Sequence, residues 1–440
     1  MKKIISKLMG GVLLLSLSMS LTSCEGALDD ILGEWSRPTP GSSTGGAVTS
    51  IGLDADEMKL AVGEKGQLTA TVAPDNATDK TVTWSSDKEE IATVDANGLV
   101  TAVALGTATI TAKAGDKMAT CEVTVLPTLS TPLTVEAITQ GKITVTSPKS
   151  GMKFSKDGGV TKINISGDAY ISVAAGDKVA FYGLATSYSG TKIGGADDGG
   201  TFKCKVYGNI MSLLYEDFAT NYTTLPADDT FYQLFKDNAR LTDASGLLLP
   251  AKTLKAKCYM GMFDRCTSLI TAPKELPATT LQNYCYNGMF YGCTSLITAP
   301  KELPATTLQN HCYYYMFYGC SSLTTAPALS ATTLDDFCCA LMFQNCSSLT
   351  TAPELKAETL KPSCYNQMFF GCSKLSSVTC LATTLDSNGC NNWLKGAGTD
   401  ASVTSRTLHI KTGQNTSDDN WKLSSSGDGS SNKWTAVADQ

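Results

Sequence analysis

Hydrophobic positions change their spacing twice along this chain. Leu8 to Leu21 form a short apolar run, which is too short to span a bilayer comfortably. From residue 48 to about residue 222, short alternating runs are separated by turn residues, which predicts antiparallel strands. From residue 254 to residue 385, the alternation gives way to a block of about 26 residues that recurs five times. The pattern therefore predicts an exported chain with a β-structured part followed by a repeat array.

The recurring block keeps its apolar positions at fixed intervals. Met262 and Phe263 return at intervals of 27, 27, 26 and 26 residues, and residues 267–283 are identical to residues 294–310. A period in this range is typical of a solenoid, whose units bury their apolar faces by stacking on one another. Residues 231–241 predict a degenerate first unit, which caps the stack with one side facing solvent. Two cysteines also recur, as Cys258/Cys266, Cys285/Cys293, Cys312/Cys320, Cys338/Cys346 and Cys364/Cys372.

The spacing inside one unit favours a short helix. Cys312, Met316 and Cys320 are four residues apart, so they would share one helical face. Gly319 is then expected to end the helix in the left-handed conformation. On such a helix the two cysteine Cα atoms would lie about 12 Å apart, beyond the limit of about 7 Å for a disulfide. We therefore expect the repeat cysteines to be mainly reduced and buried; intra-repeat disulfides are the alternative in an oxidising compartment.

The first 23 residues predict a signal peptide, because three lysines precede the short apolar run. The sequence LTSC at residues 21–24 resembles a lipobox, which implies that Cys24 becomes the lipidated first residue of the mature protein. Acidic residues directly after Cys24 resemble an export signal to the outer leaflet of the outer membrane. The resemblance implies a lipid-anchored protein exposed at the cell surface, with periplasm-facing attachment as the alternative. Residues 24–47 are expected to form the lipid anchor and a flexible linker.

Two β-structured domains are predicted after the linker. Residues 48–127 contain about eight short period-two runs, typical of an antiparallel β-sandwich, with Trp84 as its large core aromatic residue. The segments 68–86 and 94–112 resemble the bacterial Ig-like domain, group 2. The resemblance implies a spacer or adhesion module. Residues 128–222 predict a second small β-sandwich.

The repeats resemble the BspA-type leucine-rich repeat, a family of bacterial surface proteins. The FxGCxSL core of that repeat is matched at residues 290–296, 317–323 and 369–375, with Met in place of Ala before the Phe. The resemblance implies leucine-rich repeats with an N-terminal cap over residues 223–411, followed by a C-terminal cap or tail over residues 412–440. Members of the family are associated with adhesion to host matrix proteins and other cells. The fold class expected is multidomain and mainly β, ending in a leucine-rich repeat α/β solenoid.

Composition and charge argue against several functions. The formal net charge of −6 becomes −9 without the signal-peptide lysines, and no block of Lys or Arg occurs, which excludes nucleic acid and anionic membrane surfaces as expected partners. Contact with the membrane is expected through the lipid anchor alone. With two histidines and no nucleophile, phosphate-loop or metalloprotease motif, we expect no enzyme activity, no cofactor and no metal site.

Tyrosines supply the candidate ligand surface. Tyr259, Tyr286, Tyr313 and Tyr365 recur one position after the first cysteine, and we interpret them as packing between repeats, with ligand binding as the alternative. Tyr314 and Tyr315, which lie outside this column, are the better surface candidates. Variable positions also cluster on the turn just before each first cysteine, at residues 282–284, 310–311 and 335–337. The expected function is adhesin-like binding of an extracellular protein by the solenoid. A glycan-binding accessory lipoprotein and a structural stalk without its own ligand are the alternatives. The candidate surface residues are Tyr284, Asn310, His311, Tyr314, Tyr315 and Phe337.

Overall fold

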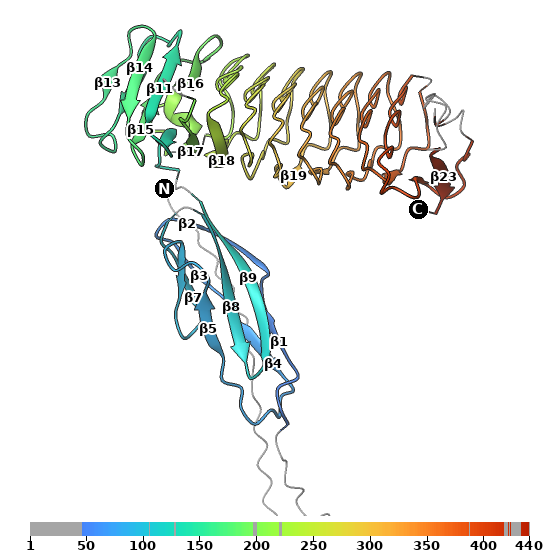
Figure 1. Ribbon diagram of the computed structural model, residues 1–440, viewed down its shortest axis with the longest axis horizontal. Coiled ribbons are helices and arrows are strands. Elements are labelled where there is room, and N and C mark those ends of the chain that lie inside the picture. The colour runs from blue at the N-terminus through green and yellow to red at the C-terminus, as the bar shows by residue number, and fades with distance from the viewer. Residues whose placement is uncertain are drawn as a thin grey trace, which may run out of the picture.

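A computed structural model describes residues 46–439, apart from 105, 127–128, 197–199, 220–221, 387, 418–420, 422 and 424–432. Figure 1 shows a long stack of coils with a β-structured unit at one end and a separate β module set at an angle beneath it. The predicted mainly-β class is confirmed. The predicted helical half of each repeat is wrong, because the described residues contain no α-helix. The predicted signal peptide, Cys24 and most of the predicted linker lie outside the described residues.

The module beneath the stack, residues 46–126, is built from two sheets. Its strands are β1 (Ser50–Leu53), β2 (Glu57–Ala61), β3 (Lys65–Gln67), β4 (Ala70–Ala73), β5 (Thr83–Ser86), β6 (Ala92–Val94), β7 (Leu99–Ala102), β8 (Gly106–Ala114) and β9 (Lys117–Leu126). One sheet has the order β2-β9-β8-β5 and the other β3-β7-β6, with β1 and β4 paired beside them. Leu60, Val100, Ile110 and Val123 fill the space between the sheets. Trp84 packs against this core but is only partly buried, so it lies at the edge of the core.

The next unit, residues 129–219, also has two sheets. Its elements are β10 (Thr134–Ala137), β11 (Gly141–Thr146), β12 (Lys153–Ser155), β13 (Ile163–Asn164), β14 (Ala169–Val173), β15 (Lys178–Tyr182), β16 (Lys192–Ala196), β17 (Cys204–Asn209) and the 3-10 turn η1 (Ile210–Leu213). The smaller sheet has the order β14-β11-β16. In the larger sheet, of order β13-β12-β15-β10-β17-β18, the last strand β18 (Leu241–Leu248) belongs to the first coil of the stack.

This second unit covers the end of the coil stack. Strand β18 pairs in parallel with β17, so one sheet crosses the domain boundary predicted at residue 222. The hydrophobic core is also continuous across it, and Tyr188 stacks on Phe231 of the first coil with ring centroids 6.2 Å apart. The first coil was predicted to face solvent on one side. That prediction is wrong, because the β unit occupies that side and shields the coil's apolar surface.

The coils stack through narrow parallel pairings. Strand β19 (Glu302–Leu303) pairs with β20 (Ala328–Leu329), and isolated bridges join Thr271 to Thr298 and Thr325 to Thr351 in successive coils. One leucine in each coil is completely buried at the same position, where its side chain is covered by the neighbouring coils. These leucines are Leu269, Leu296, Leu323, Leu349 and Leu375.

The last coils end in a three-stranded parallel sheet. Its strands are β21 (Ser377–Cys380), β22 (Thr407–Ile410) and β23 (Thr435–Ala438), the last of which falls in the predicted C-terminal cap. Three tryptophans, Trp393, Trp421 and Trp434, are buried at this end of the described stack. Trp393 donates through Nε1 to the carbonyl of Trp421 at 3.0 Å, and Trp434 donates to the carbonyl of Ala397 at 3.2 Å.

Candidate functional site

Each of the five cysteine-containing repeats carries a nine-residue segment with an unusual backbone, here called an arm. The first, fifth and ninth residues of every arm have φ between +52° and +72°, whether they are glycine or not. In the third arm these residues are His311, Tyr315 and Gly319. The predicted left-handed conformation of Gly319 is therefore correct, but it recurs every fourth residue and does not end a helix. The arms are residues 257–265, 284–292, 311–319, 337–345 and 363–371.

Hydrogen bonds between coils hold the arms in this conformation. The N–H of the fifth residue of each arm donates to a carbonyl of the next coil, as Gly288 does to Tyr314 at 2.9 Å and Leu341 to Asn366 at 2.8 Å. A non-glycine residue in the left-handed region costs about 1–2 kcal/mol. An inter-coil bond is available only when the coils are stacked, so the stack itself stabilises a backbone that an isolated repeat would not adopt.

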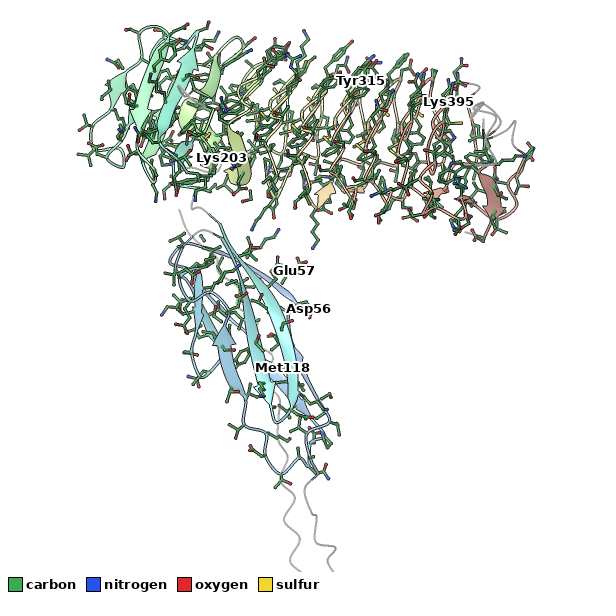
Figure 2. The ribbon with its side chains drawn as sticks, viewed as in Figure 1. Asp56, Glu57, Met118, Lys203, Tyr315 and Lys395 are labelled. Atoms are coloured by element: carbon green, nitrogen blue, oxygen red, sulfur yellow. The ribbon has the colours of Figure 1, made fainter. Side chains whose placement is uncertain are left out.

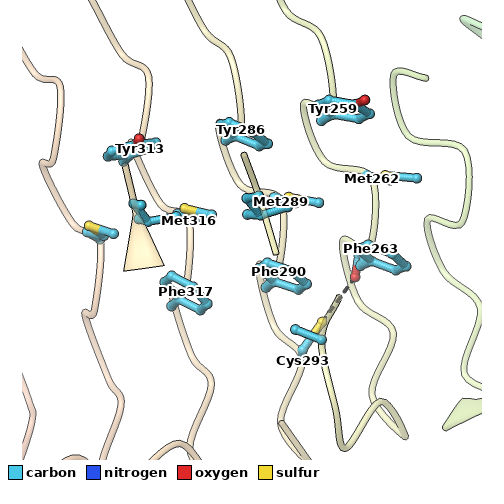
Figure 3. Packing of buried hydrophobic residues seen from close by; sticks show 14 of the residues in the cluster. Tyr259, Met262, Phe263, Tyr286, Met289, Phe290, Cys293, Tyr313, Met316 and Phe317 are labelled. Atoms are coloured by element: carbon cyan, nitrogen blue, oxygen red, sulfur yellow. Dashed lines mark hydrogen bonds between the residues drawn. The ribbon is translucent and has the colours of Figure 1, made fainter. Parts of the chain in front are cut away.

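Each arm contains two successive groups of four residues, here called tetrads, in which the second and third residues point into the stack and the first and fourth point outward. Residues at the same position of successive arms form a column along the stack. The inner columns hold Cys, Tyr, Met and Phe, and Figure 3 shows the rings and thioethers of successive coils lying over one another. Phe263 and Phe290 stack with centroids 5.4 Å apart and planes 1° apart. Tyr259 and Tyr286 stack at 5.6 Å and are completely or almost completely buried. The tyrosine column therefore packs inside the stack, and its buried side chains cannot reach a ligand.

All fifteen cysteines within the described residues are buried, and none of these fifteen forms a disulfide bond. Their thiols do not point at one another along a helix. Most of those in the arms, or directly after them, donate to carbonyls of a neighbouring coil. Burial raises the pKa of the Cys285 and Cys204 thiols to about 12, and raises that of Cys293 well above its usual value. A thiol that stays protonated is a poor nucleophile and a poor metal ligand. Reactive-cysteine chemistry is therefore disfavoured at these positions.

The outer columns bring the predicted surface residues together. Tyr284, His311 and Phe337 occupy the first column of three successive arms and stack with centroids 4.8 Å and 5.0 Å apart. Tyr314 lies edge-on to His311 at 4.8 Å and contacts Tyr315 at 4.1 Å. Five of the six candidate residues thus form one aromatic surface across three coils.

The sixth candidate, Asn310, contacts this surface through its side-chain amide. The Asn310 side chain donates to the carbonyl of Asp336 at 3.1 Å, and its Oδ1 lies 2.5 Å from His311 Nδ1. Burial lowers the pKa of His311, against a smaller opposing effect of the nearby Asp336 carboxylate. The imidazole is therefore neutral at pH 7, which suits its place between two uncharged rings.

Sequence reasoning did not select two further members of the surface. Tyr291 and Tyr318 occupy the eighth column of the second and third arms and stack at 4.8 Å, with planes 5° apart. Tyr315 lies 5.9 Å from Tyr291 and 5.4 Å from Tyr318, inclined at 83° and 78° to them. The signal available was a Tyr directly after Met-Phe in these two repeats. We call the whole group the aromatic strip: Tyr284, Tyr291, His311, Tyr314, Tyr315, Tyr318 and Phe337.

A hollow of about 270 Å³ opens beside the strip. Tyr291 and Tyr315 line it on one side, and Asp264 and Arg265 of the first arm line it on the other. Gly261 and Gly288 occupy the fifth column here, where the third arm has Tyr315, so the hollow is the space that two missing side chains leave. The remaining lining residues are Gln233, Met260 and Asn287.

Both charged groups of the hollow are already paired. Asp264 Oδ2 accepts from Lys236 Nζ at 2.7 Å, and Arg265 Nε donates to Asp237 Oδ1 at 2.7 Å. The hydrogen bond from Arg265 holds the pKa of Asp237 below its usual value, although burial partly opposes it, so the pair is charged at pH 7. Asp264 Oδ1 is buried without a hydrogen-bond partner in the described part of the chain.

The two-sheet module contacts the stack at a different edge. Lys274 Nζ donates to the hydroxyls of Thr107 and Thr124 at 3.1 Å and 3.3 Å, and burial lowers its pKa. Two ion pairs flank this contact, Lys301 with Glu57 at 2.8 Å and Lys59 with Glu275. Figure 2 shows Glu57 beneath the stack and Tyr315 along the edge turned away from the module. The aromatic strip is therefore free of the module.

Comparison with known proteins identifies part of the chain. Residues 47–125 match the bacterial Ig-like domain (group 2). The two-sheet module is a bacterial Ig-like domain. The predicted resemblance for residues 48–127 is thereby confirmed.

The curated relatives share this module and differ in the rest of their chains. An uncharacterized protein of Clostridium acetobutylicum is 52% identical over 68 residues, which is 16% of this chain and 7% of that protein. A 3-O-alpha-D-galactosyl-alpha-L-arabinofuranosidase of Bifidobacterium longum subsp. longum is 49% identical over 72 residues, 16% of this chain and 6% of the enzyme. A lacto-N-biosidase of Bifidobacterium bifidum is 46% identical over 84 residues, 19% of this chain and 8% of the enzyme.

These matches give no positive evidence of catalytic activity in this chain. The chain spans less than a tenth of the length of each of these three relatives, and the matched segment is the non-catalytic Ig-like region. No helix of the described residues is long and apolar enough to cross a membrane. Within the same residues, no group of three or more His, Cys, Asp or Glu side chains is arranged to hold a metal ion.

Proposed function

We propose that the protein is a lipid-anchored, surface-exposed binding protein of adhesin-like function, in which the coil stack is the head and the Ig-like domain is the stalk. The observation that carries the proposal is the aromatic strip. Surface tyrosines offer rigid contact area with both apolar and hydrogen-bonding character, and they are enriched where proteins bind ligands. Packing between coils does not need the strip, because the inner columns already form a complete core.

The Ig-like domain offers no comparable surface. Trp84 is its only aromatic residue, and that ring packs against the domain's own core. Its exposed large apolar side chains, for example Val62, Val103 and Met118, carry no rings. Recognition by the coil stack is therefore favoured over recognition by the Ig-like domain.

The connection of the Ig-like domain suits a stalk. Val48 lies beside Gly115, in the turn between β8 and β9. Thr107 and Thr124, which contact the stack, lie at the other end of these two strands. A nine-residue strand such as β8 spans about 26 Å. Chain that enters near residue 48 would therefore be separated from the head by the length of the domain.

We also propose that the coils are leucine-rich repeats. The recurring buried leucine and the parallel pairing between coils support a solenoid of the BspA type with non-helical arms. A surface role also fits the relatives, which include several glycosidases that carry this Ig-like domain beside other parts.

The test uses residues 25–440 on a glycan array and a panel of extracellular matrix proteins. Wild type should bind at least one class of ligand, and alanine at both Tyr314 and Tyr318 should abolish that binding. Alanine at Val62 and Met118, exposed on the Ig-like domain, is the matched control and should leave binding intact. Loss of binding in the control but not in the strip variant would reverse the assignment of head and stalk.

A further inference from the structure

We propose that the hollow between Gly261 and Tyr315 binds one ring of an uncharged glycan, whose next rings lie on the aromatic strip. This inference rests on the proposed function of the coil stack as the head. It adds the class of the ligand and the residues that receive it. Four observations support it: the origin of the hollow, its charge balance, its polar groups and the arrangement of the rings beside it.

The hollow is a local departure from an otherwise filled column. The fifth residues of the arms are Gly261, Gly288, Tyr315, Leu341 and Gln367. All five share the left-handed backbone, so the column accepts side chains, and its two glycines are not required by conformation alone. A Cβ added to Gly288 would meet its nearest neighbour, Tyr291 Cβ, at 3.7 Å, an ordinary contact. Gly288 therefore leaves space that the fold could have filled, whereas a Cβ at Gly261 would lie 3.1 Å from Gln233 Cγ and would need that flexible side chain to shift.

The charge balance of this space favours an uncharged ligand. Asp264 and Arg265 each have a partner of opposite charge, Lys236 and Asp237. An anionic or cationic ligand would have to compete with these pairs, and desolvating a charge without a new partner is costly. Hydroxyl groups, in contrast, can donate to a paired carboxylate and accept from a paired guanidinium without separating them.

The polar groups of the hollow match a ring that carries several hydroxyls. Asp264 Oδ1 has no hydrogen-bond partner among the described residues, and Asp264 is one of the residues that line the hollow. The side chain of Gln233 and the guanidinium of Arg265 offer donors within the same 270 Å³. That volume is just below the lower limit of about 300 Å³ for drug-sized ligands. The hollow therefore suits a single small ring better than a peptide segment.

The rings beside the hollow suit the continuation of a sugar chain. Tyr315 is almost equally distant from the stacked pair Tyr291 and Tyr318 and nearly perpendicular to both, so it lies across the side of that pair. This arrangement combines ring surface for C–H groups with phenolic hydroxyls for hydrogen bonds. The exposed aliphatic residues Ile270 and Ile297 lie outside the arms, so the apolar surface beside the hollow is provided by aromatic rings.

The test measures retardation of residues 25–440 in gels that contain starch, mannan, xylan or galactan as uncharged probes, with heparin and polygalacturonate as anionic probes. A glycoprotein before and after removal of its glycans separates a free polysaccharide from a protein-linked glycan as the source. We expect at least one uncharged probe to bind. Gly288→Leu should weaken that binding by roughly tenfold or more, because the leucine fills the hollow.

Gln367→Leu is the matched control, since it places the same side chain in the same column two coils beyond Tyr315 and should leave binding unchanged. Thermal melting checks that both variants fold, and Tyr315→Ala gives an independent variant that removes one wall. The inference is overturned if only anionic probes bind, if Gly288→Leu and Tyr315→Ala bind normally, or if Gln367→Leu loses binding equally. Binding to matrix protein alone, lost in the strip variant, would overturn this inference and leave the proposed function standing.

Discussion

The thiol of Cys293 donates to the backbone carbonyl of Phe263 in the preceding coil, with the sulfur 3.1 Å from the oxygen (Figure 3). The same carbonyl also accepts the N–H of Cys266 at 3.0 Å, so both of its lone pairs are used. Four other cysteines make the same inter-coil contact at 3.1 Å, which explains why the repeat keeps a small apolar residue with a donor at this position. They are Cys266, Cys320, Cys346 and Cys372.

Replacing Cys293 tests this contact. Cys293→Ala removes the donor and leaves a small void, and should lower the free energy of unfolding by about 1–3 kcal/mol. Cys293→Ser keeps a donor and should cost less than the alanine variant. Urea unfolding followed by circular dichroism measures both. A serine variant that is less stable than the alanine variant would mean that apolar packing, and not the hydrogen bond, determines this position.

The buried thiols predict that stability falls at alkaline pH. Burial raises the pKa of Cys204 and Cys285 from 9.0 to about 12, and raises that of Cys293 well above its usual value. Above pH 9 the unfolded chain releases thiol protons that the folded chain retains, so the unfolded state is favoured as pH rises. Each such group contributes a slope of about 1.4 kcal/mol per pH unit. The free energy of unfolding should be level between pH 7 and 8 and decline steeply from pH 9 to 10; a level curve to pH 10 would contradict the burial.

Two tyrosines in different environments give a paired prediction. The Tyr286 hydroxyl is buried without a hydrogen-bond partner among the described residues, whereas the Tyr188 hydroxyl donates to the carbonyl of Leu213 at 2.7 Å. Tyr286→Phe should be neutral or should stabilise the protein by up to about 1 kcal/mol, because it removes an unsatisfied group. Tyr188→Phe should destabilise it by about 1 kcal/mol. Thermal melting of the two variants in parallel checks the order, and the opposite order would refute the account of the tyrosine column.

Membrane attachment is predicted to depend on lipidation of Cys24. Cys24→Ala should move the protein from the membrane fraction to the soluble exported fraction, since lipidation requires the thiol. Immunoblotting of the two fractions provides the measurement, and wild-type protein should disappear when intact cells are treated with protease. An alanine variant that stays with the membrane would rule out the lipid anchor. Protease resistance of the wild type would instead assign it to the periplasmic side.

Sequence reasoning identified the repeat, its buried residues and the Ig-like domain, but not the backbone of the arms. Cys312, Met316 and Cys320 are spaced by four, which a helix and a series of left-handed tetrads both satisfy. Gly288 and Gly292, also four apart, were a signal for the tetrads. The deciding energy comes from hydrogen bonds between coils, which the propensities of a single repeat do not contain.

The candidate site was predictable to a similar extent. Tyr284, His311 and Phe337 could be selected because they vary at one fixed position of the repeat. The hollow could not be predicted from the sequence, because it arises where Gly261 and Gly288 supply no side chain. Sequence patterns point to residues that are present and do not reveal the space between them.

Hydroxyl-radical footprinting of residues 25–440, with and without the polysaccharide that retards it most, tests the central claim most directly. The method reports the solvent exposure of Tyr side chains, so it reads the aromatic strip itself. Tyr291, Tyr315 and Tyr318 should become protected when the polysaccharide is present, while the exposed Met118 of the Ig-like domain and Tyr170 of the end unit should react as before. Protection of Met118 or Tyr170 with an unchanged strip would contradict recognition by the coil stack.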